Sequence, residues 1–452
     1  MSPRAAGRIL WNVRKRIQIV SLCLAAATAS AQDPLSLKDA VKQALRAHPS
    51  MEVATAKIQA AGSRIGQARS GYLPRVQYSE TFQSGNNPVY VFGSLLTQRQ
   101  FAAGNFALNK LNRPDVLNNF QSTVSAEQLI YDFGGMKNNV KAAELGKQMT
   151  EQERKALELV LIAGVARAYH GVTLSDQALE VAREALKTAE ADQKRAETVR
   201  DAGMATESDV LSVKVHVAAM REQVIRRAAD AKVARAAFNE ALGLPLDTAF
   251  TLTTALAPAA GAQGEAGKSR PELEQLRLAR QAAEAQAAAA RSAYLPQVFM
   301  KGTLEADRQE FVRKGGANWM FVAGMKWNLF DGHRTRESVA EARAMAAAAQ
   351  ASERQFASAV NLEVRKAKSY FDAASERIAV TEATVAQADE SLRILRNRYS
   401  NGLATITDLL RAQTALLDAR TRRLAAIHDQ RLAALEVERA AGILNGDSNV
   451  LE

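Results

Sequence analysis

Four segments of the chain alternate between apolar and other residues with the two-residue period of a β-strand. The most regular segment lies near position 320, where one face is formed by Trp319, Phe321, Ala323, Met325, Trp327 and Leu329. The predicted strands cover about 72–84, 120–132, 294–306 and 319–330. Each strand would present one mainly apolar face and one mixed face, as in a sheet whose two sides meet different surroundings.

A seven-residue apolar period replaces this alternation in the longest part of each half. In the second half, one seam position is occupied by Ala357, Val364, Phe371, Ile378, Val385, Leu392 and Tyr399. This pattern favours helices packed as a left-handed coiled coil. Residues 333–401 contain neither Pro nor Gly, so a continuous helix there would be roughly 100 Å long. Long helices are predicted over about 135–242 and 333–442, as an extended structural coiled coil or as the wall of a tunnel.

Two sequence blocks occur twice in the same order, which indicates an internal duplication. Ala68–Val76 reappears as Ala290–Val298, and Gly203–Leu211 reappears as Gly402–Leu410. We therefore predict a first repeat over 32–257, a linker over 258–268 and a second repeat over 269–452. The first repeat has about 23 extra residues, which we place in a loop over 85–119 because that segment is rich in helix- and strand-breaking residues.

The first 31 residues have the order of a secretory signal peptide. Five basic residues precede a largely apolar run over 17–29, and Ala29-Ser30-Ala31 is a small-residue cleavage site. Removal of this segment lowers the formal charge from +11 to +6 and removes Cys23, the single cysteine. Leu22 before Cys23 argues against a lipoprotein. The modest remaining charge gives no reason to expect nucleic acid as a partner.

No later segment has 18 uncharged apolar residues, so we expect no transmembrane helix, and a membrane-embedded form would have to be a closed barrel. Four strands cannot close one, because the smallest single-chain barrels have eight, whereas three copies would supply twelve. Trp319 and Trp327 would then be residues of the membrane girdle. The alternative is a soluble hairpin packed on a core. Pro74 and Pro296 are predicted to mark the change from helix to strand.

The chain resembles the outer-membrane efflux protein family, the TolC-like channels, over about 35–445. The resemblance rests on the Tyr-Leu-Pro blocks at 72 and 294, on Leu329–Gly332 and on the block Arg398–Leu410; Asn87–Leu96 is similar to an insertion of some members. It implies a mainly helical, internally duplicated protomer with four strands, and a homotrimer with a shared twelve-stranded barrel in outer-membrane lipid and a helical tunnel in the periplasm. It also implies a periplasmic adaptor (membrane fusion) protein and an inner-membrane pump as partners, with no cofactor.

Two glycine-containing turns are the candidate site. Gly203 and Gly402 suit the left-handed residue that ends a helix, and Thr206 and Thr405 stand at capping-box spacing from Asp209 and Asp408. These residues could serve only to reverse the chain. The resemblance adds that the turns are tips where an adaptor docks, which gives the candidate docking residues Gly203, Met204, Ala205, Thr206, Gly402, Leu403, Ala404 and Thr405.

The resemblance also places Asp408 near a pore gate, with Asp209 and Arg411 as further candidates. Arg411 and Ala404 depart from the family's gate pattern, and Arg411 could pair with Asp408 at i,i+3. The favoured hypothesis is the exit duct of a tripartite efflux system for small molecules, without catalytic or metal-binding residues. The alternatives are the exit duct of a type I protein secretion system and a periplasmic coiled-coil structural or adaptor protein.

Overall fold

The computed structural model describes residues 34–262, 264 and 270–452. The predicted signal peptide and Cys23 lie outside these residues, as does most of the predicted linker's second half. The chain forms two compact units. Among the described residues, unit 1 comprises 34–51, 157–262, 264 and 362–452, and unit 2 comprises 52–156 and 270–361. Each unit is built from segments of both sequence halves.

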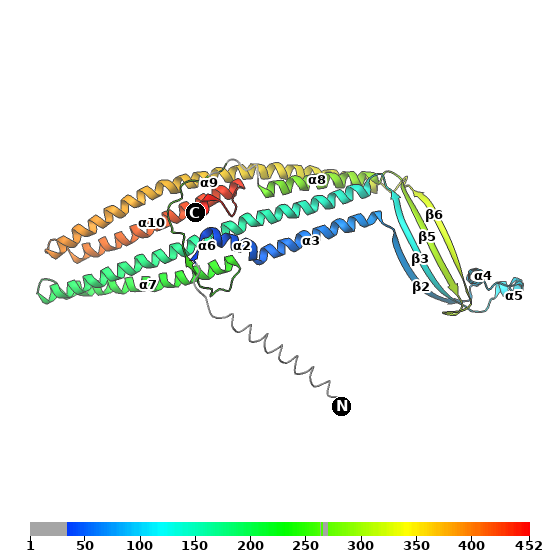
Figure 1. The fold of residues 1–452 in the computed structure, drawn as a ribbon, viewed down its shortest axis with the longest axis horizontal. Helices are drawn as coiled ribbons and strands as arrows, with labels where there is room; N and C mark the ends of the chain where they lie inside the picture. The colour runs from blue at the N-terminus through cyan, green and yellow to red at the C-terminus, as the bar shows by residue number, and fades with distance from the viewer. Residues whose placement is uncertain (1–33, 263, 265–269) are drawn as a thin grey trace, which may run out of the picture. The chain divides into compact units, whose positions relative to one another are not determined.

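The helices dominate the fold (Figure 1). The long helices α6 (Gly135–Asp201) and α9 (Arg334–Ser400) have 67 residues each, and each is followed by a 36-residue helix, α7 (Glu207–Leu242) or α10 (Ile406–Ala441). The shorter helices are α2 (Leu37–Ala47), α3 (Pro49–Arg69), α4 (Pro88–Thr97), α5 (Leu108–Asn112) and α8 (Pro271–Ser292), with 3-10 turns at Ser70–Tyr72, Ala103–Phe106 and Asn449–Leu451.

Unit 2 contains one four-stranded sheet in the order β2-β3-β5-β6 (Figure 1). Its strands are β2 (Arg75–Gly85), β3 (Leu117–Tyr131), β5 (Gln297–Arg308) and β6 (Gly315–Lys326), and every neighbouring pair is antiparallel. The two hairpins of the sequence halves are joined through β3 and β5, where Val124 pairs with Leu304. The outer strands β2 and β6 each pair along one side only.

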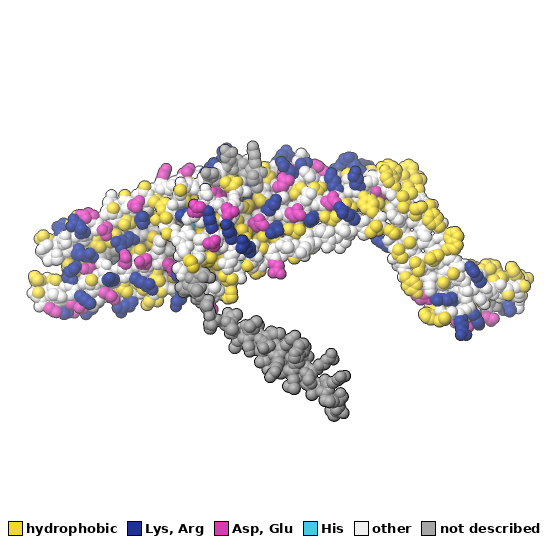
Figure 2. Space-filling model, in the orientation of Figure 1, with side chains coloured by type: hydrophobic (Ala, Val, Ile, Leu, Met, Phe, Trp, Pro, Cys, Tyr) yellow, Lys and Arg dark blue, Asp and Glu magenta, His cyan; other side chains and the backbone are white. Residues whose placement is uncertain are grey.

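The register places the apolar sides of all four strands on the same face. Tyr78 pairs with Val124, Val124 with Leu304, and Leu304 with Trp319, so these four side chains form one row across the sheet. Each is exposed, from 39% for Val124 to 78% for Trp319. Figure 2 shows hydrophobic side chains gathered over the strands, while charged side chains are spread over the helices. A sheet face with this much exposed apolar area needs a partner or a lipid environment.

The strand bounds differ from those expected by three or four residues at several ends. β2 starts at Arg75 because Ser70–Tyr72 form a 3-10 turn, and Pro74 has no N–H to contribute to a ladder. β6 runs from Gly315 rather than 319, since Gly315–Ala317 pair with the end of β5, and it stops at Lys326. The predicted loop over 85–119 was wrong in part, because it contains α4 and α5.

The core of unit 1 gathers both ends of the described chain around α6. Tyr169, fully buried, donates its hydroxyl to the Leu35 carbonyl at 3.1 Å and accepts from the Thr254 amide at 2.8 Å. The short strands β1 (Pro34–Leu35) and β4 (Thr251–Leu252) pair beside it. Gln430 on α10 holds the segment that follows β4. Its side-chain oxygen accepts from the Ala259 N–H at 2.8 Å, and its side-chain nitrogen donates to the Ala259 carbonyl at 3.1 Å.

One described helix, α6, contains an 18-residue window of mean hydropathy 1.3, long and apolar enough to cross a membrane. Half of that window is buried inside the protein. Its buried positions, among them Val165, Tyr169 and Val172, belong to the core of unit 1. Packing within this core therefore accounts for the apolar window.

His170 is buried in this core with 1% of its surface exposed, and neither ring nitrogen has a hydrogen-bond partner. Burial lowers its pKa to about 3, and the positive charge of Arg431 and the nearby His428 act in the same direction. The unfolded chain therefore binds a proton at higher pH than the folded chain does. This histidine stabilises the fold above its unfolded pKa, and that stability is lost as the pH falls toward 3.

We expect His170→Leu to reduce the acid sensitivity of the fold. Between pH 7.5 and 4.5 the unfolding free energy of the wild type should fall by about 2–3 kcal/mol more than that of the variant, since each pKa unit corresponds to about 1.4 kcal/mol. Thermal unfolding at the two pH values measures the difference. Equal shifts of Tm in both proteins would contradict this account of His170.

Candidate functional site at the helical hairpins

The two hairpins α6–α7 and α9–α10 end in turns of the same geometry. Gly203 and Gly402 have φ of +77° and +72°, a region that favours glycine. In the first turn, the Gly203 and Met204 amides donate to the carbonyls of Arg200 and Val199 at 2.8 and 3.0 Å. The second turn repeats these bonds with Gly402. Both long helices therefore end in a Schellman motif, which satisfies their last carbonyls.

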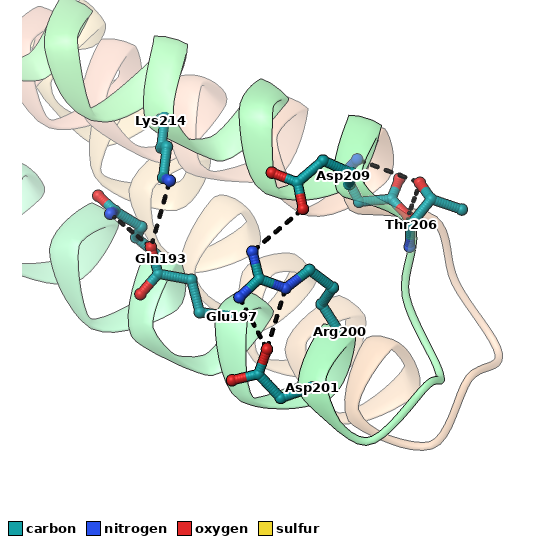
Figure 3. Close-up of polar contacts among 8 residues, drawn as sticks. Gln193, Glu197, Arg200, Asp201, Thr206, Asp209 and Lys214 are labelled. Atoms are coloured by element: carbon teal, nitrogen blue, oxygen red, sulfur yellow. Dashed lines mark hydrogen bonds and ion pairs between the residues drawn. The ribbon is translucent and has the colours of Figure 1, made fainter.

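Each return helix begins with a capping box in which Asp replaces the more usual Glu. The Thr206 hydroxyl accepts from the Asp209 amide at 3.2 Å, and the Asp209 carboxylate accepts from the Thr206 amide and hydroxyl at 2.9 and 2.8 Å (Figure 3). Thr405 and Asp408 make the corresponding bonds at 3.2, 3.2 and 2.6 Å. Both aspartates are thus already bound within their own turns.

The turns present apolar side chains at equivalent positions. Met204 is 76% exposed and Leu403 is 67% exposed, each directly after the turn glycine. Ala205 and Ala404 follow them in the two connecting turns. Each tip therefore presents one large exposed apolar side chain followed by an alanine.

The first tip carries a charged cluster that the second lacks. Arg200 lies 2.7 Å from the Asp201 carboxylate (Figure 3). It also lies 3.1 Å from the Glu207 carboxylate. The hydrogen bond with Asp201 is the main reason why the pKa of Arg200 is raised. One turn further from the tip, Lys214 lies 3.8 Å from Glu197. The contacts of Arg200 with Glu207 and of Lys214 with Glu197 join α6 to α7 across the hairpin, whereas Arg200 and Asp201 both belong to α6.

Arg411 does not pair with Asp408. Within the described residues no ion pair joins them, and Arg411 instead lines a groove of about 700 Å³ between α7 and α10. The pKa of Asp408 is lowered chiefly by the hydrogen bond from the Thr405 side chain, while Arg411 contributes only through its charge. The suggested i,i+3 pair is therefore wrong, and the cap accounts for the Asp408 carboxylate.

A buried carboxylate that the sequence did not single out links the two hairpins. Asp192 on α6 is only 3% exposed. It accepts from Arg195 at 2.8 Å, from Arg396 on α9 at 3.4 Å and from the side-chain amide of Gln413 on α10. The surrounding residues form one apolar cluster that includes Val213 on α7 and Leu409 on α10. Asp192 is thus the polar centre of a four-helix bundle. We call Asp192 and its partners Arg195, Arg396 and Gln413 the Asp192 cluster.

The neighbourhood of the Asp192 cluster is not closely packed. A cavity of about 150 Å³ is lined by His216, Arg396 and Gln413, among other residues of the four helices. Close to the cluster, though not among the residues that line this cavity, the Tyr399 hydroxyl is buried without a hydrogen-bond partner, and its pKa is raised by burial and by the negative charges of Asp209 and Asp192. The cavity and the unpartnered hydroxyl show that packing and hydrogen bonding around the cluster are incomplete.

The sequence did contain a signal for Asp192. Ala189 and Ala196 occupy the heptad seam, so a residue three after the first and four before the second lies on the same side of α6. The second repeat has Ser391 at the equivalent place. The detectable feature was therefore a charged residue on the seam side of the helix in the first repeat, at a position where the second repeat has no charge.

Of the predicted girdle and junction residues, Trp319 lies within a strand, and Trp327, Pro74 and Pro296 lie directly next to strand ends. Trp319 is in β6 on the apolar face, and Trp327 directly follows β6, with its indole N–H donating to the Tyr294 carbonyl at 3.0 Å. Pro74 directly precedes β2, and Pro296 directly precedes β5. In the part of the chain that the structure describes, no three His, Cys, Asp or Glu side chains are placed to hold a metal ion.

Comparison with known proteins identifies the class. A sequence model of the outer membrane efflux protein family matches residues 40–244 and 263–443, and the chain therefore belongs to this family. CyaE from Bordetella pertussis is 26% identical over 446 residues, which cover 91% of this chain and 85% of CyaE.

Two further similarities agree with this assignment. The probable outer membrane lipoprotein SilC from Salmonella typhimurium is 23% identical over 307 residues, which cover 63% of this chain and 64% of SilC. The crystal structure of a membrane protein from Pseudomonas aeruginosa superimposes with a TM-score of 0.77 at 22% identity, covering 90% of this chain and 93% of that one. The structural similarity shows a shared fold.

We expect Thr206→Ala and Thr405→Ala each to loosen their own tip. Loss of an N-cap side chain costs about 1 kcal/mol, so amide hydrogen exchange in the first turn of α7 or α10 should be about fivefold faster. Mass spectrometry of hydrogen exchange measures this. Thr414→Ala is the control, because its hydroxyl bonds the Leu410 carbonyl within α10. Unchanged exchange at both tips would show that the caps are not needed.

Proposed function

We propose that this protein is the outer-membrane exit duct of an efflux system and works as a homotrimer. The observation that carries the proposal is the sheet of unit 2, which has one continuous exposed apolar face and two open edges. A soluble protein would need to cover the apolar face and both open edges. A barrel shared by three copies removes the edges and turns the apolar face to lipid, as a membrane requires.

The opposite face of the sheet suits the lining of a channel. It carries Gln121, Thr123 and Ser125 on β3, and Lys301 and Glu305 on β5. In membrane barrels polar residues alternate inward with apolar residues outward. Trp319, within β6, and Trp327, directly after it, are the proposed girdle residues.

The helices support a duplicated protomer with a periplasmic tunnel. The matching lengths of α6 and α9, and of α7 and α10, agree with the two repeats inferred from the sequence. We assign 32–257 to the first repeat and 269–452 to the second. The apolar ends Met204 and Leu403 then serve as docking points for a periplasmic adaptor that connects the duct to an inner-membrane pump.

The proposed duct needs a gate, and we assign this role to the Asp192 cluster together with Asp209, Asp408 and Arg411 near the tips. The cluster ties the α6–α7 hairpin to the α9–α10 hairpin in one protomer. Breaking a buried charged contact by removing one partner is strongly destabilising. The cluster can therefore hold the hairpins in one arrangement until an adaptor supplies replacement contacts.

Conductance in a planar lipid bilayer tests the proposal directly. The purified mature protein, first shown to be trimeric in detergent by its mass, should insert and give reproducible conductance steps. A folded protein that never inserts into lipid would favour a soluble coiled-coil protein instead. A protein that inserts but conducts weakly is the result expected of a duct with a closed gate.

We expect Asp192→Ala to raise the open fraction in the same bilayer. If the Asp192 contacts stabilise the closed state by only about 1.4 kcal/mol, their loss changes the ratio of open to closed channels tenfold. We therefore expect the open fraction to increase by about tenfold or more. Asp201→Ala is the matched control, because Asp201 is on the same helix but is 67% exposed. An Asp192→Ala trimer that conducts like the wild type would show that the Asp192 cluster is not part of the gate.

A further inference from the structure

The first repeat contains a segment that has no counterpart in the second, the insertion over residues 86–116. It connects β2 to β3 and includes α4 and α5. Within unit 2, the helices α3, α6 and α8 join the sheet at the end where β2 and β5 begin and β3 ends. The insertion lies at the opposite end, where β2 ends and β3 begins (Figure 1).

The insertion is bound to the polar face of the sheet. Gln98, fully buried at the end of α4, donates its side-chain amide to the Asn118 carbonyl and to the Asn119 side chain, both at 2.9 Å. Asn119 in turn donates to the buried Asp307 carboxylate of β5 at 2.7 Å. Asn119 and Asp307 alternate with Phe120 and Arg308 along their strands. They therefore point away from the apolar face.

Further contacts hold the same segment on the far strand. Arg99 donates to the Ala317 carbonyl of β6 at 2.7 Å, and the Asn318 side chain donates to the Thr97 carbonyl at 3.3 Å. The approach is so close that a Cβ at Gly316 would lie 2.7 Å from both the Thr97 oxygen and the Arg99 Cγ. The insertion therefore reaches from the β2–β3 connection across the sheet to β6.

Tyr90 fixes the start of α4 in the same way. Its hydroxyl lies 3.0 Å from the Gln83 carbonyl and 3.2 Å from the Leu117 carbonyl, at the ends of β2 and β3. Both ends of α4 are thus hydrogen-bonded to strand backbone. Contacts of this number and burial describe a fixed structural part, in contrast to a freely moving loop.

We propose that the insertion is a fixed constriction at the outer mouth of the channel and limits the size of what can leave. This inference rests on the proposed function, because only a closed barrel turns the polar face inward. A helix with its side chains is about 10 Å wide. An eight-stranded barrel has room only for its own side chains, and 16 strands leave an aqueous pore. Three helices at the mouth of a twelve-stranded barrel therefore occupy much of its opening.

Gly316→Val tests this inference, because the new side chain must displace Thr97 and Arg99 from the sheet. Single-channel conductance should rise about twofold, and larger polyethylene glycols should enter the pore in a polymer-exclusion experiment. Gly302→Val is the matched control, since Gly302 lies on the apolar side of β5 with no atom within 4 Å of the added Cβ. The control should conduct and exclude polymers like the wild type.

A cysteine reporter shows whether the insertion has moved. Ser94 on α4 is 8% exposed, and the predicted mature chain has no other cysteine, so Ser94→Cys should react with maleimide only after displacement. A second variant, in which a two-residue turn replaces 86–116, removes the insertion outright. The constriction is refuted if Gly316→Val exposes the reporter but the polymer cut-off still equals that of the wild type. It is also refuted if the shortened chain forms trimers with the wild-type cut-off. A folded wild type that never inserts into lipid would instead refute the proposed function.

Discussion

The backbone hydrogen bonds that the sheet leaves unmade along its two edges must be satisfied elsewhere, and this requirement governs how the protein can assemble. Among the described strands, β2 and β6 each have one side without a strand partner. Exposed edges invite uncontrolled pairing in water, and each unsatisfied group costs several kcal/mol in hydrocarbon. A protomer with four such strands cannot close a barrel by itself. A second copy supplies a complementary edge, since β6 of one copy can pair with β2 of the next, and repetition around an axis leaves no edge open.

The helices face a different difficulty, which the Asp192 cluster addresses. Alanines such as Ala189 and Ala196 let the helices approach closely. However, contacts between small apolar side chains alone do not fix the axial register of one helix relative to its neighbours. A buried carboxylate with partners on three helices is satisfied in only one register. Buried polar groups of this kind are best known for fixing the register of coiled coils. The same requirement makes the cluster suitable for the proposed gate, because separation of the hairpins takes Arg396 and Gln413 away from the carboxylate and leaves only Arg195 on its own helix.

Most of the fold, but only part of the site, could be predicted from the sequence. Alternation and heptads are local signals, so Trp319 and Val364 could be assigned to a sheet face and a helix seam. The capping threonines could likewise be placed, because Thr-x-x-Asp acts within one turn. The contacts of Asp192 with Arg396 and Gln413 join residues more than 200 positions apart, and no local pattern specifies them. The helices in 85–119 were missed because Pro88 and several glycines suggested a loop, whereas Asn87 and Pro88 in fact begin α4.

The differences between the two repeats have a geometric consequence for the proposed channel. Two similar repeats in each of three copies would surround the axis with six similar hairpins, and a feature present in both repeats would occur six times. The insertion is present once per chain, and so is the aspartate that Ser391 replaces in the second repeat. Six helices about 10 Å wide would block a twelve-stranded barrel, whereas three narrow it. Likewise, two buried carboxylates per bundle would compete for the same arginines, whereas one is satisfied by Arg195 and Arg396. Both features therefore depend on the repeats having diverged.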